Sequence, residues 1–108
     1  MTGITVCVCG ESGEQLTTPI WVDQGDDPIH WVSALIPPVS DRGSACWRFI
    51  DPYGLTTFNR LQLATFVEEI DRRSANATSR QLGKLEEIRA LADFALALPH
   101  RYLRFAGD

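Results

Sequence analysis

The sequence has no lysine or arginine before Arg42, although the same stretch holds six carboxylates. It has only three cysteines, an odd number that allows at most one internal disulfide. No apolar run approaches the roughly 18 residues needed to cross a bilayer. Phosphate-binding glycine loops, nucleophile-elbow motifs and paired-histidine zinc motifs are also missing. These absences disfavour a membrane protein, a disulfide-stapled scaffold and the enzymes that such motifs mark.

The missing cations leave the two halves of the chain with different charges. Residues 1–56 hold seven acids and two arginines, a net charge of −5, and residues 57–108 hold seven acids and eight bases, a net of +1. The sum is −4, the net charge of the whole chain. A small domain with one acidic end repels phosphate backbones and attracts basic partners. The sequence therefore predicts a basic protein partner and no nucleic acid.

At 108 residues, the chain is expected to form one globular domain over residues 1–108. Its hydrophobic content of 44% and charged content of 22% are ordinary, and a chain of this length can bury a core without staples. The first residues lack the basic and apolar regions of a signal peptide. We therefore expect a cytoplasmic protein whose cysteines are reduced.

Short apolar runs predict a strand-rich N-terminal half, with strands at residues 3–9, 16–22, 46–50 and 55–58. The first run is apolar on both faces and predicts a central strand. Pro19 pushes the start of the second toward an edge or a bulge. Asp51 opens a type I turn that would join the last two runs as a hairpin. Residues 29–36 remain either a strand or a short helix.

Helical periodicity begins after Asn59, which is a good N-cap and forms a capping box with Gln62. The first apolar stripe is Leu63, Phe66, Val67 and Ile70. A second helix starts at Thr78 or Ser79, with the stripe Leu82, Leu85, Ile88, Leu91, Ala92 and Ala95. Residues 102–105 predict a final strand. The expected fold is α+β, a mostly antiparallel sheet (N-terminal meander plus hairpin) packed against two adjacent helices, with a C-terminal strand.

Residue types that carry metal or nucleophilic chemistry are sparse. A zinc site would have to draw on Cys7, Cys9, Cys46, His30 and His100, without a second cysteine pair. No spacing pairs a histidine with a cysteine, as a thiol nucleophile requires. Adjacent carboxylates occur only in a turn and on helix faces, where they are typical of solvated surface. We expect no catalytic residue, no metal, no cofactor and no enzymatic activity.

The three tryptophans, Trp21, Trp31 and Trp47, all fall in the strand-rich half and are most typical of a core. Tryptophan is also a preferred anchor at protein interfaces. If Trp21 or Trp31 is exposed beside Asp23, Asp26 and Asp27, the result is an aromatic patch ringed by carboxylates. Such a patch could grip a basic protein surface.

The C-terminal part of the chain resembles a known group of proteins. The similarity rests on Trp47-Arg48-Phe49-Ile50-Asp51-Pro52-Tyr53-Gly54, on Thr57-Phe58-Asn59, on the two helices, and on the ending Tyr102-Leu103-Arg104-Phe105-Ala106-Gly107-Asp108. This pattern is similar to small bacterial immunity proteins that accompany polymorphic toxins, including those of contact-dependent growth inhibition. The resemblance implies a cytoplasmic protein without enzymatic activity that blocks one cognate toxin.

Charge and resemblance lead to the same expectation. Many toxins of this kind are nucleases with basic clefts that bind phosphates, and an acidic partner would be steered to such a cleft and occlude it. We therefore expect an immunity protein that neutralises a cognate toxin through its acidic N-terminal half. The expected toxin-binding residues are Glu11, Glu14, Trp21, Asp23, Asp26, Asp27 and Trp31.

Two other functions remain open. A small-molecule binder or small enzyme would place its pocket between the sheet and the helices, with Asp51, Tyr53 and Arg104 as polar groups. A homodimeric scaffold would instead bury the tryptophan patch in itself. The sequence leaves the choice between monomer and homodimer undecided.

Overall fold

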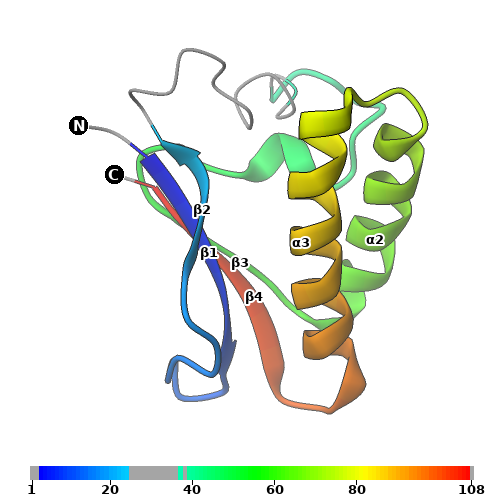
Figure 1. Cartoon of the computed structure of the whole chain (residues 1–108). Helices are drawn as coiled ribbons and strands as arrows, with labels where there is room; N and C mark the ends of the chain where they lie inside the picture. The colour runs from blue at the N-terminus through cyan, green and yellow to red at the C-terminus, as the bar shows by residue number, and fades with distance from the viewer. Residues whose placement is uncertain (1–2, 25–36, 38, 108) are drawn as a thin grey trace.

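The computed structural model describes residues 3–24, 37 and 39–107 (Figure 1). The strands are β1 (Gly3–Gly10), β2 (Ile20–Gln24), β3 (Leu55–Phe58) and β4 (Arg101–Ala106). The helices are the 3-10 helix η1 (Trp47–Phe49), α2 (Arg60–Ser74) and α3 (Ser79–Ala97). The four strands form one antiparallel sheet in the order β2-β1-β4-β3. Both α-helices lie on one face of this sheet, which confirms the expected α+β class (Figure 1).

β1 is a central strand, as its composition predicts, because it pairs with β2 on one side and with β4 on the other. Its alternate side chains divide between the two faces of the sheet. Ile4, Val6 and Val8 are buried in the core beneath the helices. Cys7 and Cys9 therefore belong to the opposite face, where they are also buried.

β4 occupies the middle of the sheet although it comes last in the chain. It lies between β1 and β3, and its Leu103 and Phe105 are fully buried. Beyond it, the Gly107 amide donates to the Gly54 carbonyl at 2.7 Å. A Cβ at Gly107 would lie 2.3 Å from the Pro52 carbonyl oxygen, so only glycine fits this close approach. The C-terminal strand is thereby fixed to the turn that precedes β3.

Aromatic rings fill the space between the sheet and α2. The ring of Trp47 stacks on Phe66, with centroids 5.0 Å apart and planes 5° from parallel. Phe58 meets Phe105 edge to face at 6.0 Å, and Phe66 lies 5.9 Å from Phe105. These rings come from η1, β3, α2 and β4, so packing among them fixes how four elements sit together.

The two α-helices begin where the sequence predicts. Asn59 and Gln62 exchange hydrogen bonds at 2.9 and 3.0 Å, and Thr78 and Gln81 do the same at 3.0 and 3.2 Å. Each exchange is a complete capping box. Both apolar stripes face the core, with these members buried: Leu63, Phe66, Ile70, Leu85, Ile88, Ala92 and Ala95. Within the residues described, no helix has the length and apolar character needed to span a bilayer.

The prediction of a strand at residues 46–50 is wrong, because this segment contains η1 instead. The Phe49 amide donates to the Cys46 carbonyl at 3.0 Å and the Ile50 amide to the Trp47 carbonyl at 3.2 Å. The Cys46 amide donates to the Glu69 carboxylate of α2. The donors that a strand would offer to a neighbour are therefore already used. β3 consequently pairs with β4 and not with residues 46–50.

The second predicted strand is shorter than expected. It begins at Ile20, because the Leu16 and Thr17 amides both donate to the single Val8 carbonyl, at 2.8 and 3.3 Å. The Thr17 hydroxyl also accepts from the Val8 amide at 2.9 Å. β2 is an edge strand, as Pro19 suggested, and its register with β1 shifts between Ile4 and Thr5. The segment predicted at residues 29–36 lies outside the described residues.

Candidate functional site

Of the carboxylates proposed from the sequence, the structure describes the positions of Glu11, Glu14 and the Asp23 backbone, and these do not gather at one place. Glu11 and Glu14 lie in the turn that follows β1, and both are exposed. A carboxylate oxygen of Glu11 is 3.4 Å from Nδ1 of His100, and a carboxylate oxygen of Glu14 accepts from the Ser12 amide at 3.0 Å. These two acids therefore mark the end of the sheet where β1 finishes.

Asp23 lies toward the other end of the same sheet. Its backbone pairs with Ile4 near the start of β1. The strand between Ile4 and Gly10 rises about 3.3 Å per residue, so roughly 20 Å separate Asp23 from the turn that holds Glu11 and Glu14. The structure does not bring Asp23 together with those two acids. Asp26, Asp27 and Trp31 lie outside the described residues.

Ion pairs divide the described charges into two groups. The helices pair their own carboxylates: Glu69 with Arg73, Asp71 and Asp93 with Arg89, and Glu87 with Lys84. The exposed N-terminal acids Glu11, Glu14 and Asp41 make no ion pair with a lysine or arginine among residues 3–24, 37 and 39–107. Glu11, Glu14 and Asp41 are therefore exposed acids without a lysine or arginine partner in the described part of the chain, whereas much of the acidity of the helices is compensated locally.

The tryptophans have different roles. Trp47 is fully buried, so the core prediction is confirmed for it. Trp21 is 50% exposed and lies on β2, where its carbonyl accepts from Nζ of Lys84 at 2.7 Å. Trp21 is therefore exposed, but the side chains of Asp23, Asp26 and Asp27, which were expected beside it, lie outside the described part of the structure.

Trp21 belongs to the sheet face that points away from the helices. Cross-strand pairing places Trp21 opposite Thr5, Thr5 opposite Ala106, and Ala106 opposite Leu55. In the next row of this face, Cys7 lies opposite Arg104. We call this surface the open face, defined by Trp21, Thr5, Ala106, Leu55 and Arg104.

The cysteines are free, buried and divided between the two sides of the sheet. Cys46 is in the helix-side core, where its thiol donates to the Gln62 carbonyl at 3.5 Å, and Cys7 and Cys9 lie on the other side. Burial raises the pKa of the Cys9 thiol, partly opposed by the charge of Arg104. Burial also raises the pKa of Cys46, and the charge of Glu69 adds to that shift. At neutral pH both thiols stay protonated and are poor nucleophiles.

Metal binding has no support from the described geometry. In the part of the chain that the structure places, no three histidine, cysteine, aspartate or glutamate side chains gather closely enough to hold an ion.

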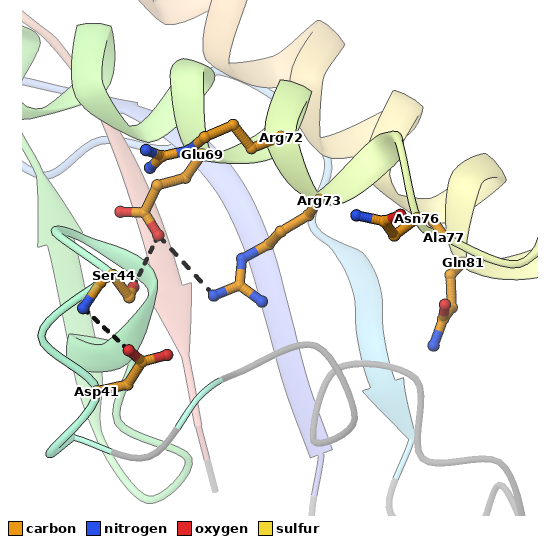
Figure 2. Close-up of a pocket in the computed structure, with 9 residues that line it drawn as sticks. Asp41, Ser44, Glu69, Arg72, Arg73, Asn76, Ala77 and Gln81 are labelled. Atoms are coloured by element: carbon orange, nitrogen blue, oxygen red, sulfur yellow. Dashed lines mark hydrogen bonds and ion pairs between the residues drawn. The ribbon is translucent and has the colours of Figure 1, made fainter.

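A cleft of about 450 Å³ opens between the loop at residues 41–44, the end of α2 and the start of α3 (Figure 2). Its lining residues are Asp41, Gly43, Ser44, Glu69, Arg72, Arg73, Asn76, Ala77 and Gln81. The sequence did not point to this cleft, because its walls come from three segments that are individually ordinary surface.

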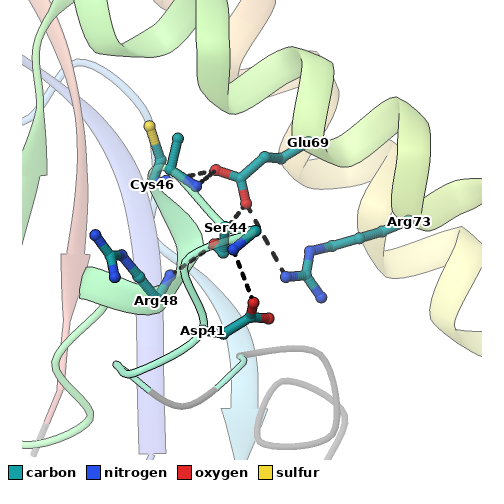
Figure 3. Close-up of polar contacts among 8 residues, drawn as sticks. Asp41, Ser44, Cys46, Arg48, Glu69 and Arg73 are labelled. Carbon is teal, nitrogen blue, oxygen red and sulfur yellow. Dashed lines mark hydrogen bonds and ion pairs between the residues drawn. The ribbon is translucent and has the colours of Figure 1, made fainter.

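Glu69 is the one buried carboxylate on the wall of this cleft and is only 2% exposed (Figure 3). Its Oε2 accepts from the Ser44 hydroxyl at 2.7 Å, and its Oε1 accepts from the amides of Ala45 and Cys46. An Arg73 guanidinium nitrogen lies 4.0 Å from Oε2. Both oxygens are thus engaged by the protein. This geometry ties the loop to α2 and is not that of a free acid or base.

Glu69 was not expected as a site residue, because the adjacent carboxylates Glu68 and Glu69 are typical of a solvated helix face. Glu68 is exposed, as this expectation requires, whereas Glu69 is buried. The missed signal is spacing. Glu69 follows Phe66 by three residues and precedes Ile70, so it falls on the buried stripe of α2.

The polar groups expected for a ligand pocket between sheet and helices lie elsewhere. Asp51 and Tyr53 are exposed in the turn before β3, where a carboxylate oxygen of Asp51 accepts from the Tyr53 amide at 2.8 Å. Arg104 lies on the open face and donates to the Gly13 carbonyl at 3.3 Å. None of the three faces the layer of apolar side chains beneath the helices.

Comparison of the chain with protein-family models, curated proteins and solved structures finds no match. The assignment of function therefore depends on the charges, exposure and contacts described above.

Proposed function

We propose that this chain is an immunity protein that binds a basic toxin domain and neutralises it, as in contact-dependent growth inhibition. One observation carries the proposal: Glu11, Glu14 and Asp41 are exposed and lack lysine or arginine partners among the described residues, whereas the helices pair most of their own acids internally. A charge distribution of this kind costs self-repulsion, and a basic partner relieves it.

The mechanism is occlusion and needs no chemistry from this chain. A nuclease cleft is basic because it must hold phosphates. Exposed carboxylates raise the rate of encounter with such a cleft and set the orientation of approach. Once seated, the chain excludes the nucleic acid from the cleft. In this proposal the chain has no catalytic residue and acts in the cytoplasm, where the toxin would meet its substrate.

The test uses the C-terminal domain encoded by the reading frame immediately upstream, expressed with and without this chain. We expect wild-type chain to restore growth and to bind the purified domain. The variant Glu11→Lys/Glu14→Lys should bind at least tenfold more weakly at low salt, since it reverses two exposed acids in the N-terminal half.

The matched control is Glu68→Lys/Glu86→Lys, which makes the same change in net charge at two exposed helical positions. This control should bind within about threefold of wild type, because its two substituted positions are on the helices, away from the proposed contact. Equal weakening by the two double variants would show that only net charge matters. Absence of any growth rescue by the wild-type chain would contradict the proposed function itself.

A small-molecule binder is the second candidate, favoured by the 450 Å³ cleft beside Arg72, Asn76 and Gln81. A ligand that binds only the folded state raises the melting temperature. A metabolite panel that gives a concentration-dependent rise, abolished by Asn76→Leu, would favour this candidate over the immunity function.

A further inference from the structure

The open face is the largest part of the sheet that no helix covers in the region the structure describes (Figure 1). Both of its outer strands carry a large exposed apolar side chain. Trp21 on β2 is 50% exposed, and Leu55 on β3 is 69% exposed. They end the same cross-strand row, so three inter-strand spacings, about 14 Å, separate them.

The row between these two side chains is small and uncharged. Thr5 and Ala106 occupy its two central positions, and both are partly buried. The centre of the row is therefore low, and the two large side chains lie at its ends. Such a profile accepts a convex surface, with one large apolar anchor at each side. Tryptophan, which Trp21 supplies at one end of the row, is among the residues that most often dominate the energetics of protein interfaces.

The described strands carry two cations, and only one of them lies on the open face. Arg101 of β4 lies over the ring of Phe94 at 4.1 Å, which places it on the helix side. Arg104 is the one cation that the described strands place on the open face, and it is partly buried and donates to the Gly13 carbonyl. The one strand cation beside the apolar row is therefore partly buried and engaged with a backbone carbonyl.

Carboxylates lie beyond both ends of the face. Glu11 and Glu14 are in the turn at one end of β1. At the other end, Asp51 is held against β3 by a hydrogen bond from its amide to the Thr56 hydroxyl at 2.8 Å. A partner that matches this surface carries lysines or arginines around an apolar centre. A second copy of this chain fits less well, because each copy has a net charge of −4 and would bring its acids against those of the other.

We infer that the open face is the surface on which the basic toxin domain docks, with Trp21 and Leu55 as its two anchors and the acids at its ends steering the approach. This inference rests on the proposed function and adds to it the place of contact. The acidic turn alone would offer charge without buried apolar area, and stable interfaces of standard size bury about 800 Å² on each partner.

The experiment measures binding of the upstream-encoded C-terminal domain by calorimetry, using wild-type chain and the variants Trp21→Ser, Leu55→Ser and both together. Loss of an interface anchor commonly weakens binding roughly 30-fold or more. We expect each single variant to lose at least tenfold and the double variant at least 30-fold. The control is Leu61→Ser, since Leu61 is 85% exposed but lies on the first turn of α2. It should bind as wild type does.

A folding defect is separated from lost contact by footprinting the wild-type complex with hydroxyl radicals. Oxidation of Trp21 and Leu55 should fall at least fivefold on binding, while Leu61 stays as reactive as in the free chain. This result needs no variant to fold.

The outcomes distinguish the inference from the proposed function. If wild-type chain neither binds the domain nor restores growth, the proposed function fails. If wild-type chain protects, but the double variant binds within threefold of it and Trp21 stays reactive in the complex, only the open-face assignment fails. A wild-type dimer in light scattering that Trp21→Ser converts to a monomer would also overturn the assignment, because a second copy would then occupy the face.

Discussion

Removal of the Glu69 carboxylate should destabilise the fold more than any other change to a single charged residue. Its oxygens accept three hydrogen bonds, and two of these, from the Ser44 hydroxyl and the Cys46 amide, are buried. A hydrogen bond to a charged group contributes about 1.5–3 kcal/mol, and a buried donor left without a partner keeps its full desolvation cost. Glu69→Ala should therefore lower the free energy of unfolding by about 3–5 kcal/mol.

The size of this effect is large beside the 5–15 kcal/mol that typically stabilises a small domain. At about 4 °C per kcal/mol for a domain of this size, the melting temperature should fall by roughly 12 °C or more. Glu69→Gln should cost less, about 1–2 kcal/mol, because one amide oxygen can still accept from the loop. Urea denaturation followed by circular dichroism measures all three proteins.

Glu68→Ala is the matched control, since it removes the neighbouring carboxylate from an exposed position of the same helix. A change within about 0.5 kcal/mol is expected for it. If Glu69→Ala and Glu68→Ala differed by less than 1 kcal/mol, the loop at residues 41–47 would not depend on this carboxylate. The structural role given to Glu69 would then be refuted.

Four further predictions rest on local contacts. In native protein at pH 8, Cys9 and Cys46 should react with a disulfide reagent far more slowly than in urea, and rapid native reaction would contradict their raised pKa values. The pKa values of these thiols in the folded state exceed the value of about 8.5 for an unfolded thiol, so the folded state holds extra protons above that pH. The free energy of unfolding should therefore fall as the pH rises from about 8.5. A urea midpoint that stays constant over pH 8–10 would argue against this prediction. Gly107→Ala should lower the melting temperature, because its Cβ would meet the Pro52 carbonyl, whereas Gly83→Ala, with open space around it, should not. Asn59→Ala removes an N-cap and should lower the free energy of unfolding by about 1 kcal/mol in urea denaturation. Asn59→Asp should keep most of that stability.

Features set by neighbouring residues could be predicted from the sequence. The capping boxes at Asn59 and Thr78 involve residues three apart, so their signals are complete within one helical turn. The apolar alternation of β1 likewise indicated a central strand. Both predictions depend on local chemistry and on burial, which the residue pattern records directly.

Features set by distant contacts could not be predicted in the same way. Residues 46–50 have the composition of a strand, but a carboxylate more than 20 residues away takes their amides. The insertion of β4 between β1 and β3 also depends on contacts across most of the chain. Pattern alone does not identify which partner a strand will choose.

The candidate site shows the same division. The charge asymmetry and the candidacy of Trp21 as an interface anchor could be inferred from the sequence. The separation of Asp23 from Glu11 and Glu14 could be seen only from the antiparallel pairing of β1 and β2. In such a pair, the turn after β1 and the far end of β2 lie at opposite ends of the sheet. The placement of Trp21 and Leu55 at the two ends of one cross-strand row depended on the complete strand order.

The most direct test of the central claim is the association rate of wild-type chain with the upstream-encoded C-terminal domain, measured by stopped flow between 20 and 500 mM salt. Exposed acids that steer the chain to a basic partner predict a rate that falls at least tenfold over this range, with a dissociation rate that changes much less. An association rate independent of salt would contradict this prediction, because the exposed N-terminal carboxylates would then have no part in recognition.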